Sequence, residues 1–68
     1  MTQLNVRLRE VRKMRGKKLQ ECADCLGIKL RSYQAYEGGE RVPNVESLII
    51  LADFFDVTLD YLMGRTDS

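Results

Sequence analysis

The residues with the most reactive side chains are two cysteines, Cys22 and Cys25, which are separated by two other residues. A pair with this spacing can form a redox couple or half of a zinc site. The redox couple needs a strand-helix-strand setting and zinc needs a second pair of ligands, and the sequence offers neither. We therefore expect Cys22 to be a small core residue with Cys25 beside it, and we expect no metal and no cofactor.

Other catalytic groups are missing from the sequence. It contains no histidine, no glycine-rich phosphate loop and no nucleophile placed beside a general base. A chain of 68 residues can bury only one small core, so residues 1–68 are expected to form a single domain. We expect a binding protein and not an enzyme.

The apolar runs of the chain are short. The longest, from Ser47 to Ala52, is far below the roughly 20 residues that cross a bilayer. The first residues are polar and lack the apolar segment of a secretory signal. We expect a cytoplasmic protein with no membrane partner.

Charge is distributed unevenly along the chain, although the formal net charge is only +1. Residues 1–15 carry five basic residues and one glutamate, whereas residues 46–68 carry one arginine and five acidic residues. Such an asymmetry can orient a molecule toward a polyanion. The alternative is that these charges only solvate the helix faces.

Apolar residues recur at spacings of three and four in five segments, which is typical of helices that bury one face. Asn44 and Thr58 are good helix caps, and Gly16, Gly27 and Gly64 are good stop signals. No segment alternates with a period of two. The sequence therefore predicts an all-α fold with a helix-turn-helix at about residues 19–37. The expected helices cover residues 4–15, 19–26, 30–37, 45–55 and 59–63.

Small residues, aromatic residues and the Gly and Pro positions together resemble the phage repressor and Cro-like (xenobiotic response element) helix-turn-helix family. This resemblance implies a compact, five-helix, lambda-repressor-like DNA-binding domain. It further implies sequence-specific binding of double-stranded operator DNA by a transcriptional regulator, most simply a repressor. The matching segments are Leu8-Arg9-Glu10-Val11-Arg12, Cys22 to Ile28, Tyr33, Tyr36 to Asn44, Leu48 to Ala52 and Thr58 to Gly64.

The family places its third helix in the major groove, so the resemblance implies that residues 30–37 contact the bases. Arg31 would donate two hydrogen bonds to a guanine, and Gln34 would contact a base edge or a phosphate. Lys29 suits either target, while Leu30 and Ala35 could make only apolar contacts, for example with a thymine methyl. Solvated surface positions are the alternative for Lys29, Arg31 and Gln34.

Phosphate contacts are expected from cations and helix starts near the same pair of helices. The candidates are Lys17, Lys18, Arg41 and Asn44, and each alone could equally be a bystander.

Other matched positions are expected to be structural. The resemblance implies an ion pair between Arg12 and Glu37, which would tie the first helix to the end of the third. Tyr33 and Tyr36 are expected in the core, with their hydroxyls at its edge, and the alternative is that their rings stack on bases.

Three positions depart from the family pattern. Leu19 replaces a glutamine that commonly contacts a phosphate, Lys29 replaces a Ser or Thr cap, and Glu40 replaces a common basic residue. The departures at Leu19 and Glu40 support an alternative function, a protein-interaction module that serves an antirepressor or antitoxin-like partner.

Helix-turn-helix domains usually bind as homodimers to two half-sites about 34 Å apart. Apolar residues at the end of the chain are the expected dimer contact, and the alternative is that they complete the core of a monomer. These residues are Leu59, Leu62, Met63 and either Phe54 or Phe55.

Overall fold

The computed structural model describes residues 3–66, and this part of the chain folds into helices and connecting turns with no strand. The all-α prediction is confirmed, and each predicted helix is present within a residue or so of its expected ends. The helices are α1 (Leu4–Met14), α2 (Leu19–Leu26), α3 (Leu30–Glu37), α4 (Val45–Phe55) and α5 (Leu59–Leu62).

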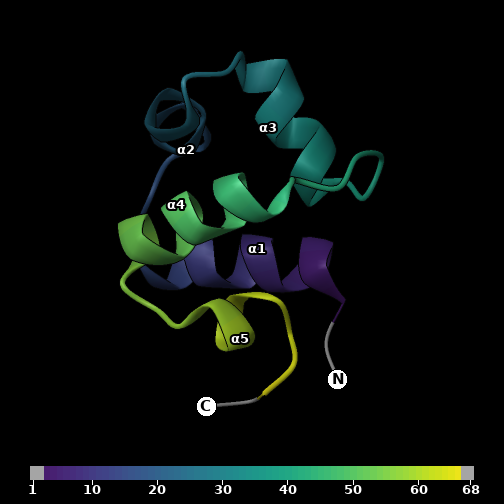
Figure 1. The fold of residues 1–68 in the computed structure, drawn as a ribbon. Coiled ribbons are helices and arrows are strands. Elements are labelled where there is room, and N and C mark those ends of the chain that lie inside the picture. The colour runs from purple at the N-terminus through teal and green to yellow at the C-terminus, as the bar shows by residue number, and fades with distance from the viewer. Residues whose placement is uncertain (1–2, 67–68) are drawn as a thin grey trace.

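The helices are arranged on two sides of a central pair. In Figure 1, α1 and α4 occupy the middle of the molecule, α2 and α3 lie above them, and α5 lies below. Contacts between elements agree with this view, since α2 packs on α3 and α4, α3 packs on α1, and α5 packs on α1 and α4. Helices α3 and α5 therefore lie on opposite sides of the molecule (Figure 1).

The starts and ends of the helices are set by the local signals in the sequence. The Asn44 side chain accepts a hydrogen bond from the backbone N–H of Ser47 at 2.8 Å, and the Thr58 hydroxyl accepts one from the backbone N–H of Tyr61 at 3.1 Å. Gly27 ends α2 with a left-handed φ of 68°, a conformation that a side chain would disfavour. The tight turn that joins α2 to α3 begins at this glycine.

The core contains apolar residues from all five helices. Cys22 is fully buried, as predicted, and burial raises the pKa of its thiol and of the partly buried Cys25 thiol. Both cysteines therefore stay protonated and poorly nucleophilic. Phe55 and Leu62 are also in the core. For these two residues the structure thus agrees with the alternative, in which they complete the core of the monomer. The buried apolar set is Leu8, Val11, Cys22, Ala23, Tyr33, Leu48, Leu51, Ala52, Phe55 and Leu62.

Arg7 has a structural role that the sequence analysis missed. Arg7 is only 5% exposed. Its Nη1 donates hydrogen bonds to the backbone carbonyls of Tyr61 at 2.8 Å and Thr66 at 3.2 Å. Its guanidinium also lies 4.2 Å from the centre of the Tyr61 ring. Arg7 thus ties α1 to the segment that follows α5. The sequence did contain a signal for this role, because Arg7 lies between Leu4 and Val11 on the apolar face of α1.

Tyr33 is fully buried, and its hydroxyl has no hydrogen-bond partner within residues 3–66. Its ring packs edge-on against Tyr36, with 6.3 Å between the ring centres. An unpaired buried hydroxyl destabilises the fold, so we expect Tyr33→Phe to raise the free energy of unfolding at neutral pH by about 1 kcal/mol. Chemical denaturation measures this change, and Tyr36→Phe is the matched control. A loss of stability in Tyr33→Phe would show that the hydroxyl is paired in solution.

The same substitution should change the response to alkali. Burial raises the pKa of Tyr33 above the ordinary value of 10.0, so the folded state keeps a proton that the unfolded state loses above that pH. Ionisation of Tyr33 therefore has no effect on the free energy of unfolding well below pH 10 and lowers it above that pH, with a slope that approaches about 1.4 kcal/mol per pH unit. We expect Tyr33→Phe to lose less stability than the parent between pH 10 and pH 11, in denaturation curves recorded at both values.

Candidate nucleic-acid interface

One side of α3 faces the core and the other faces solvent. Tyr33 and Glu37 point inward and are buried, while Arg31 and Gln34 are exposed. The main contacts of α3 are with α1 and α2, and α5 lies across the molecule from it (Figure 1). The outer face of α3 is therefore free of the domain's own last helix.

The polar side chains at the start of α3 are available to a ligand. Lys29 precedes the helix in an extended conformation, with φ −74° and ψ 151°, is exposed, and makes no side-chain capping bond. The backbone N–H groups of a first helical turn carry a partial positive charge, which Lys29 reinforces. Leu30 and Ala35 are half-buried beside the exposed Arg31 and Gln34.

The four phosphate candidates are in different situations. Lys18 is exposed just before α2, and Arg41 is exposed in the loop between α3 and α4. Lys17 is half-buried, with its ammonium 4.8 Å from the centre of the Phe54 ring, and the Asn44 side chain caps α4. Two of the four side chains thus already serve the fold.

The predicted pair between Arg12 and Glu37 is present. Arg12 Nε donates to Glu37 Oε2 at 2.7 Å and its Nη2 donates to Oε1 at 3.1 Å, while its Nη1 reaches the carbonyl of Lys17 at 3.2 Å. The two side chains are 13% and 6% exposed. The hydrogen bonds to Glu37 raise the pKa of Arg12. This bidentate pair fixes the last turn of α3 against α1, and so sets the orientation of the exposed face.

The loop after α3 is held close to α1. Gly39 has a left-handed φ of 80°, and a side chain there would come within 3.2 Å of the Asn5 amide nitrogen. The backbone N–H groups of Glu40 and Arg41 both donate to the carbonyl of Ala35, at 3.0 and 3.3 Å. These contacts place Arg41 at the end of α3.

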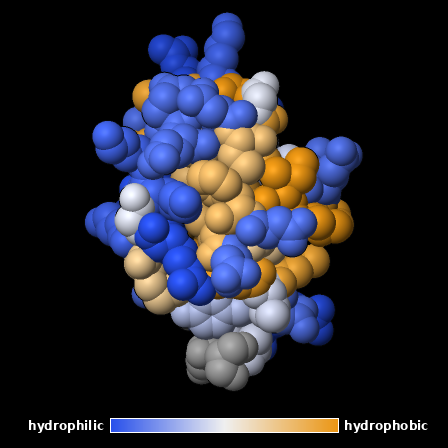
Figure 2. All heavy atoms as spheres, turned by 90° about the vertical axis from the view of Figure 1, so that its left-hand side faces the viewer, coloured by the Kyte–Doolittle hydropathy of each residue, from blue (hydrophilic) through white to orange (hydrophobic). Residues whose placement is uncertain are grey.

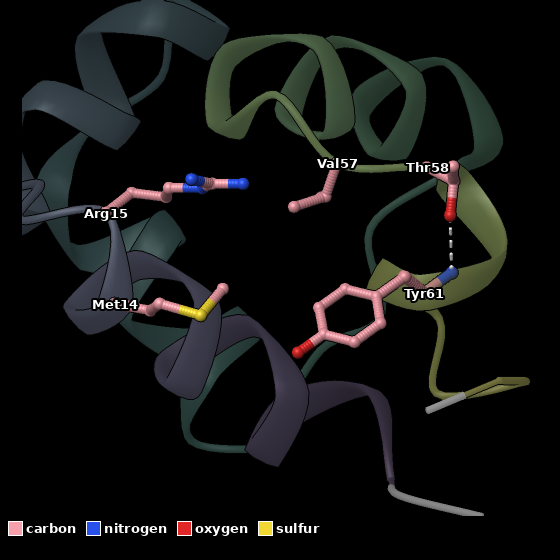
Figure 3. A pocket seen from close by; sticks show the side chains of 5 residues that line it. All are labelled: Met14, Arg15, Val57, Thr58 and Tyr61. Carbon is pink, nitrogen blue, oxygen red and sulfur yellow. Dashed lines mark hydrogen bonds between the residues drawn. The ribbon is translucent and has the colours of Figure 1, made fainter. Parts of the chain in front are cut away.

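Apolar surface is found on several parts of the molecule, including Val42 in the loop after α3. Figure 2 views the end of the molecule where α2 and the last turn of α4 lie, and it shows apolar atoms across the middle and right of this face. On α4, Ile49 is 46% exposed and Ile50 is 37% exposed. A groove of about 220 Å³ lies between the end of α1 and the start of α5 (Figure 3). It is lined by Met14, Arg15, Val57, Thr58 and Tyr61.

The sequence pattern of the helix-turn-helix family matches residues 8–62, from α1 through α5. The chain belongs to the helix-turn-helix family. Its helix-turn-helix unit is α2 and α3, as the sequence predicted, and the exposed residues described above lie on the second helix of that unit.

Several proteins named as transcriptional regulators or repressors are similar to this chain. It is 51% identical over 59 residues to the HTH-type transcriptional regulator AnsR of Bacillus subtilis, covering 87% of this chain and 51% of that protein. It is 42% identical over 59 residues to the cryptic phage CTXphi transcriptional repressor RstR of Vibrio cholerae, covering 87% and 53%. The chain thus spans about half the length of these relatives.

A solved structure has the same helix-turn-helix fold. A transcriptional regulator from Listeria innocua superimposes with a TM-score of 0.86 at 32% sequence identity, covering 97% of this chain and 62% of that one.

Within residues 3–66, no helix is long and apolar enough to span a bilayer. The same range holds no group of three His, Cys, Asp or Glu side chains arranged to bind a metal.

Proposed function

We propose that this domain binds double-stranded DNA sequence-specifically, with α3 in the major groove, and regulates transcription, most simply as a repressor. The observation that carries this proposal is that the two faces of α3 differ. The helix buries Tyr33 and Glu37 and exposes Arg31 and Gln34. Relatives named as transcriptional regulators, one of them a phage repressor, support it. The function is binding and not catalysis, and the site of action is the cytoplasm.

The proposed roles follow from side-chain chemistry. Arg31 forms a bidentate contact with a guanine, and Gln34 and Lys29 contact a base edge or a phosphate. Leu30 and Ala35 provide apolar contact at the floor of the groove. The phosphate contacts come from Lys18 and Arg41, which are exposed, with smaller contributions from Lys17 and Asn44.

The proposed DNA-bound form is a homodimer on two half-sites, because one short helix reads too few base pairs for high specificity. Phe55 and Leu62 are buried in the core, so the proposed partner contact comes from the remaining candidates Phe54, Leu59 and Met63, which are half-buried. A concentration series in sedimentation tests this: a monomer at all concentrations, with and without DNA, contradicts it.

Selection of bound sequences from a random DNA pool, followed by gel shifts, tests the proposed function. On the selected site we expect Arg31→Ala to weaken binding by about 1–3 kcal/mol and to relax the preference at one base pair. Arg65→Ala is the control, because Arg65 is exposed and follows α5, the helix that lies across the molecule from α3 (Figure 1). Equal binding by Arg31→Ala and the parent would contradict the role of Arg31. No shift at low salt would favour a protein partner instead.

A further inference from the structure

A second groove, of about 250 Å³, lies beside the end of α3, where three helices meet. Polar groups line most of it, unlike the groove in Figure 3. The lining residues are Arg9 and Arg12 from α1, Leu19 from the start of α2, and Gln34, Glu37 and Gly38 from the end of α3.

The charges of this groove do not cancel. Arg12 and Glu37 are occupied by their bidentate pair, with distances of 2.7 and 3.1 Å. Arg9 is exposed, and across residues 3–66 its guanidinium makes no hydrogen bond and no ion pair. Its donors are therefore free, and the groove carries one excess positive charge. A guanidinium of this kind binds the oxygens of a phosphate in bidentate geometry.

The groove lies beside the exposed face of α3, which decides what kind of phosphate could reach it. Gln34 lines the groove and also belongs to the exposed face of α3. When α3 lies in a major groove, the groove beside its last turn faces the sugar-phosphate backbone that borders it. Leu19, on the third wall, has no hydrogen-bonding group, so donors for a phosphate must come from the neighbouring side chains.

We propose that this groove binds one phosphodiester group of the DNA backbone and that Arg9 is its principal ligand. This inference rests on the proposed function and adds to it a contact from α1, outside the helix-turn-helix unit. Arg9 positions the domain on DNA and reads no base, so its contribution is the same on every sequence.

The test measures the dissociation constant of the 68-residue chain for the selected site and for a scrambled duplex, over a series of KCl concentrations. The variants are Arg9→Gln, Arg9→Lys and the control Arg65→Ala. For each bound subunit, we expect Arg9→Gln to weaken binding to both duplexes by the same factor, roughly fivefold to tenfold near 0.1 M salt, and to lower the log–log salt slope by about 0.9. A bound dimer carries two copies of Arg9 and should lose about 1.8 from its slope. Arg9→Lys should keep the slope and lose less affinity, because it keeps the charge without the planar fork.

Other outcomes overturn the inference. If the parent binds DNA and Arg9→Gln keeps its full salt slope, or weakens only the selected site, the groove holds no phosphate but the proposed function stands. An equal effect of Arg65→Ala would show a general effect of net charge and also overturn it. Saturable binding of inorganic phosphate alone, lost in Arg9→Gln, would identify a free anion site. If the parent binds neither duplex at low salt, both proposals fail.

Discussion

Arg12→Ala should lower the free energy of unfolding by about 3–5 kcal/mol, the cost of leaving a buried charge without its partner. The Glu37 side chain is only 6% exposed, and both of its carboxylate oxygens accept hydrogen bonds from Arg12. The loss also frees the Lys17 carbonyl, which Arg12 Nη1 contacts at 3.2 Å. Domains of this size have a total stability of only about 3–10 kcal/mol, so this loss removes a large share of it.

Urea denaturation followed by circular dichroism measures this loss. The informative control is the double variant Arg12→Leu with Glu37→Leu, which removes both charges and fills similar space. We expect the double variant to recover most of the stability, because an apolar pair often replaces a buried ion pair at little cost. A loss below about 1 kcal/mol in Arg12→Ala would show that Glu37 reaches solvent, since exposed ion pairs contribute no more than that.

The affinity for DNA should fall about a thousandfold between 50 and 200 mM salt, if each subunit of a dimer neutralises about three phosphates. The exposed cations around α3 (Lys18, Lys29 and Arg41) and Arg9 in the polar groove are sufficient for this number. Each neutralised phosphate releases condensed counterions, and the entropy of that release decreases as bulk salt increases.

Fluorescence anisotropy with a labelled operator measures this dependence. The matched comparison is Lys18→Gln against Lys13→Gln, since both residues are exposed but only Lys18 is a phosphate candidate. The Lys18 variant should have a smaller slope, and the Lys13 variant should match the parent. An affinity that hardly changes with salt would mean that the domain binds its ligand without phosphate contacts.

The helices were predictable because their signals are local. Asn44 and Thr58 bond to backbone groups only three residues away, and Gly27 adopts the left-handed conformation that its residue type favours. The outward position of Arg31 and Gln34 follows from helical periodicity once Tyr33 is placed inward. Periodicity therefore predicted most of the exposed face of α3.

Features that depend on distant parts of the chain were harder to predict. The bonds of Arg7 join residues 54 and 59 positions apart, and no local pattern encodes them. The pair of Arg12 and Glu37 was expected only through the family resemblance. The groove around Arg9 was missed because its walls come from three helices, and their relative placement is a property of the packing. Lys17 looks like a free basic residue in the sequence, but its ammonium lies against the Phe54 ring.

The bonds from Arg7 to the carbonyls of Tyr61 and Thr66 have a practical consequence for protein engineering. They hold the last described residues beside α1 and α5, on the side of the molecule away from α3 (Figure 1). A fluorescent label attached to this segment would lie on that side and leave the outer surface of α3 unobstructed. Labels should therefore be placed in the segment after α5, with Arg7 left unchanged.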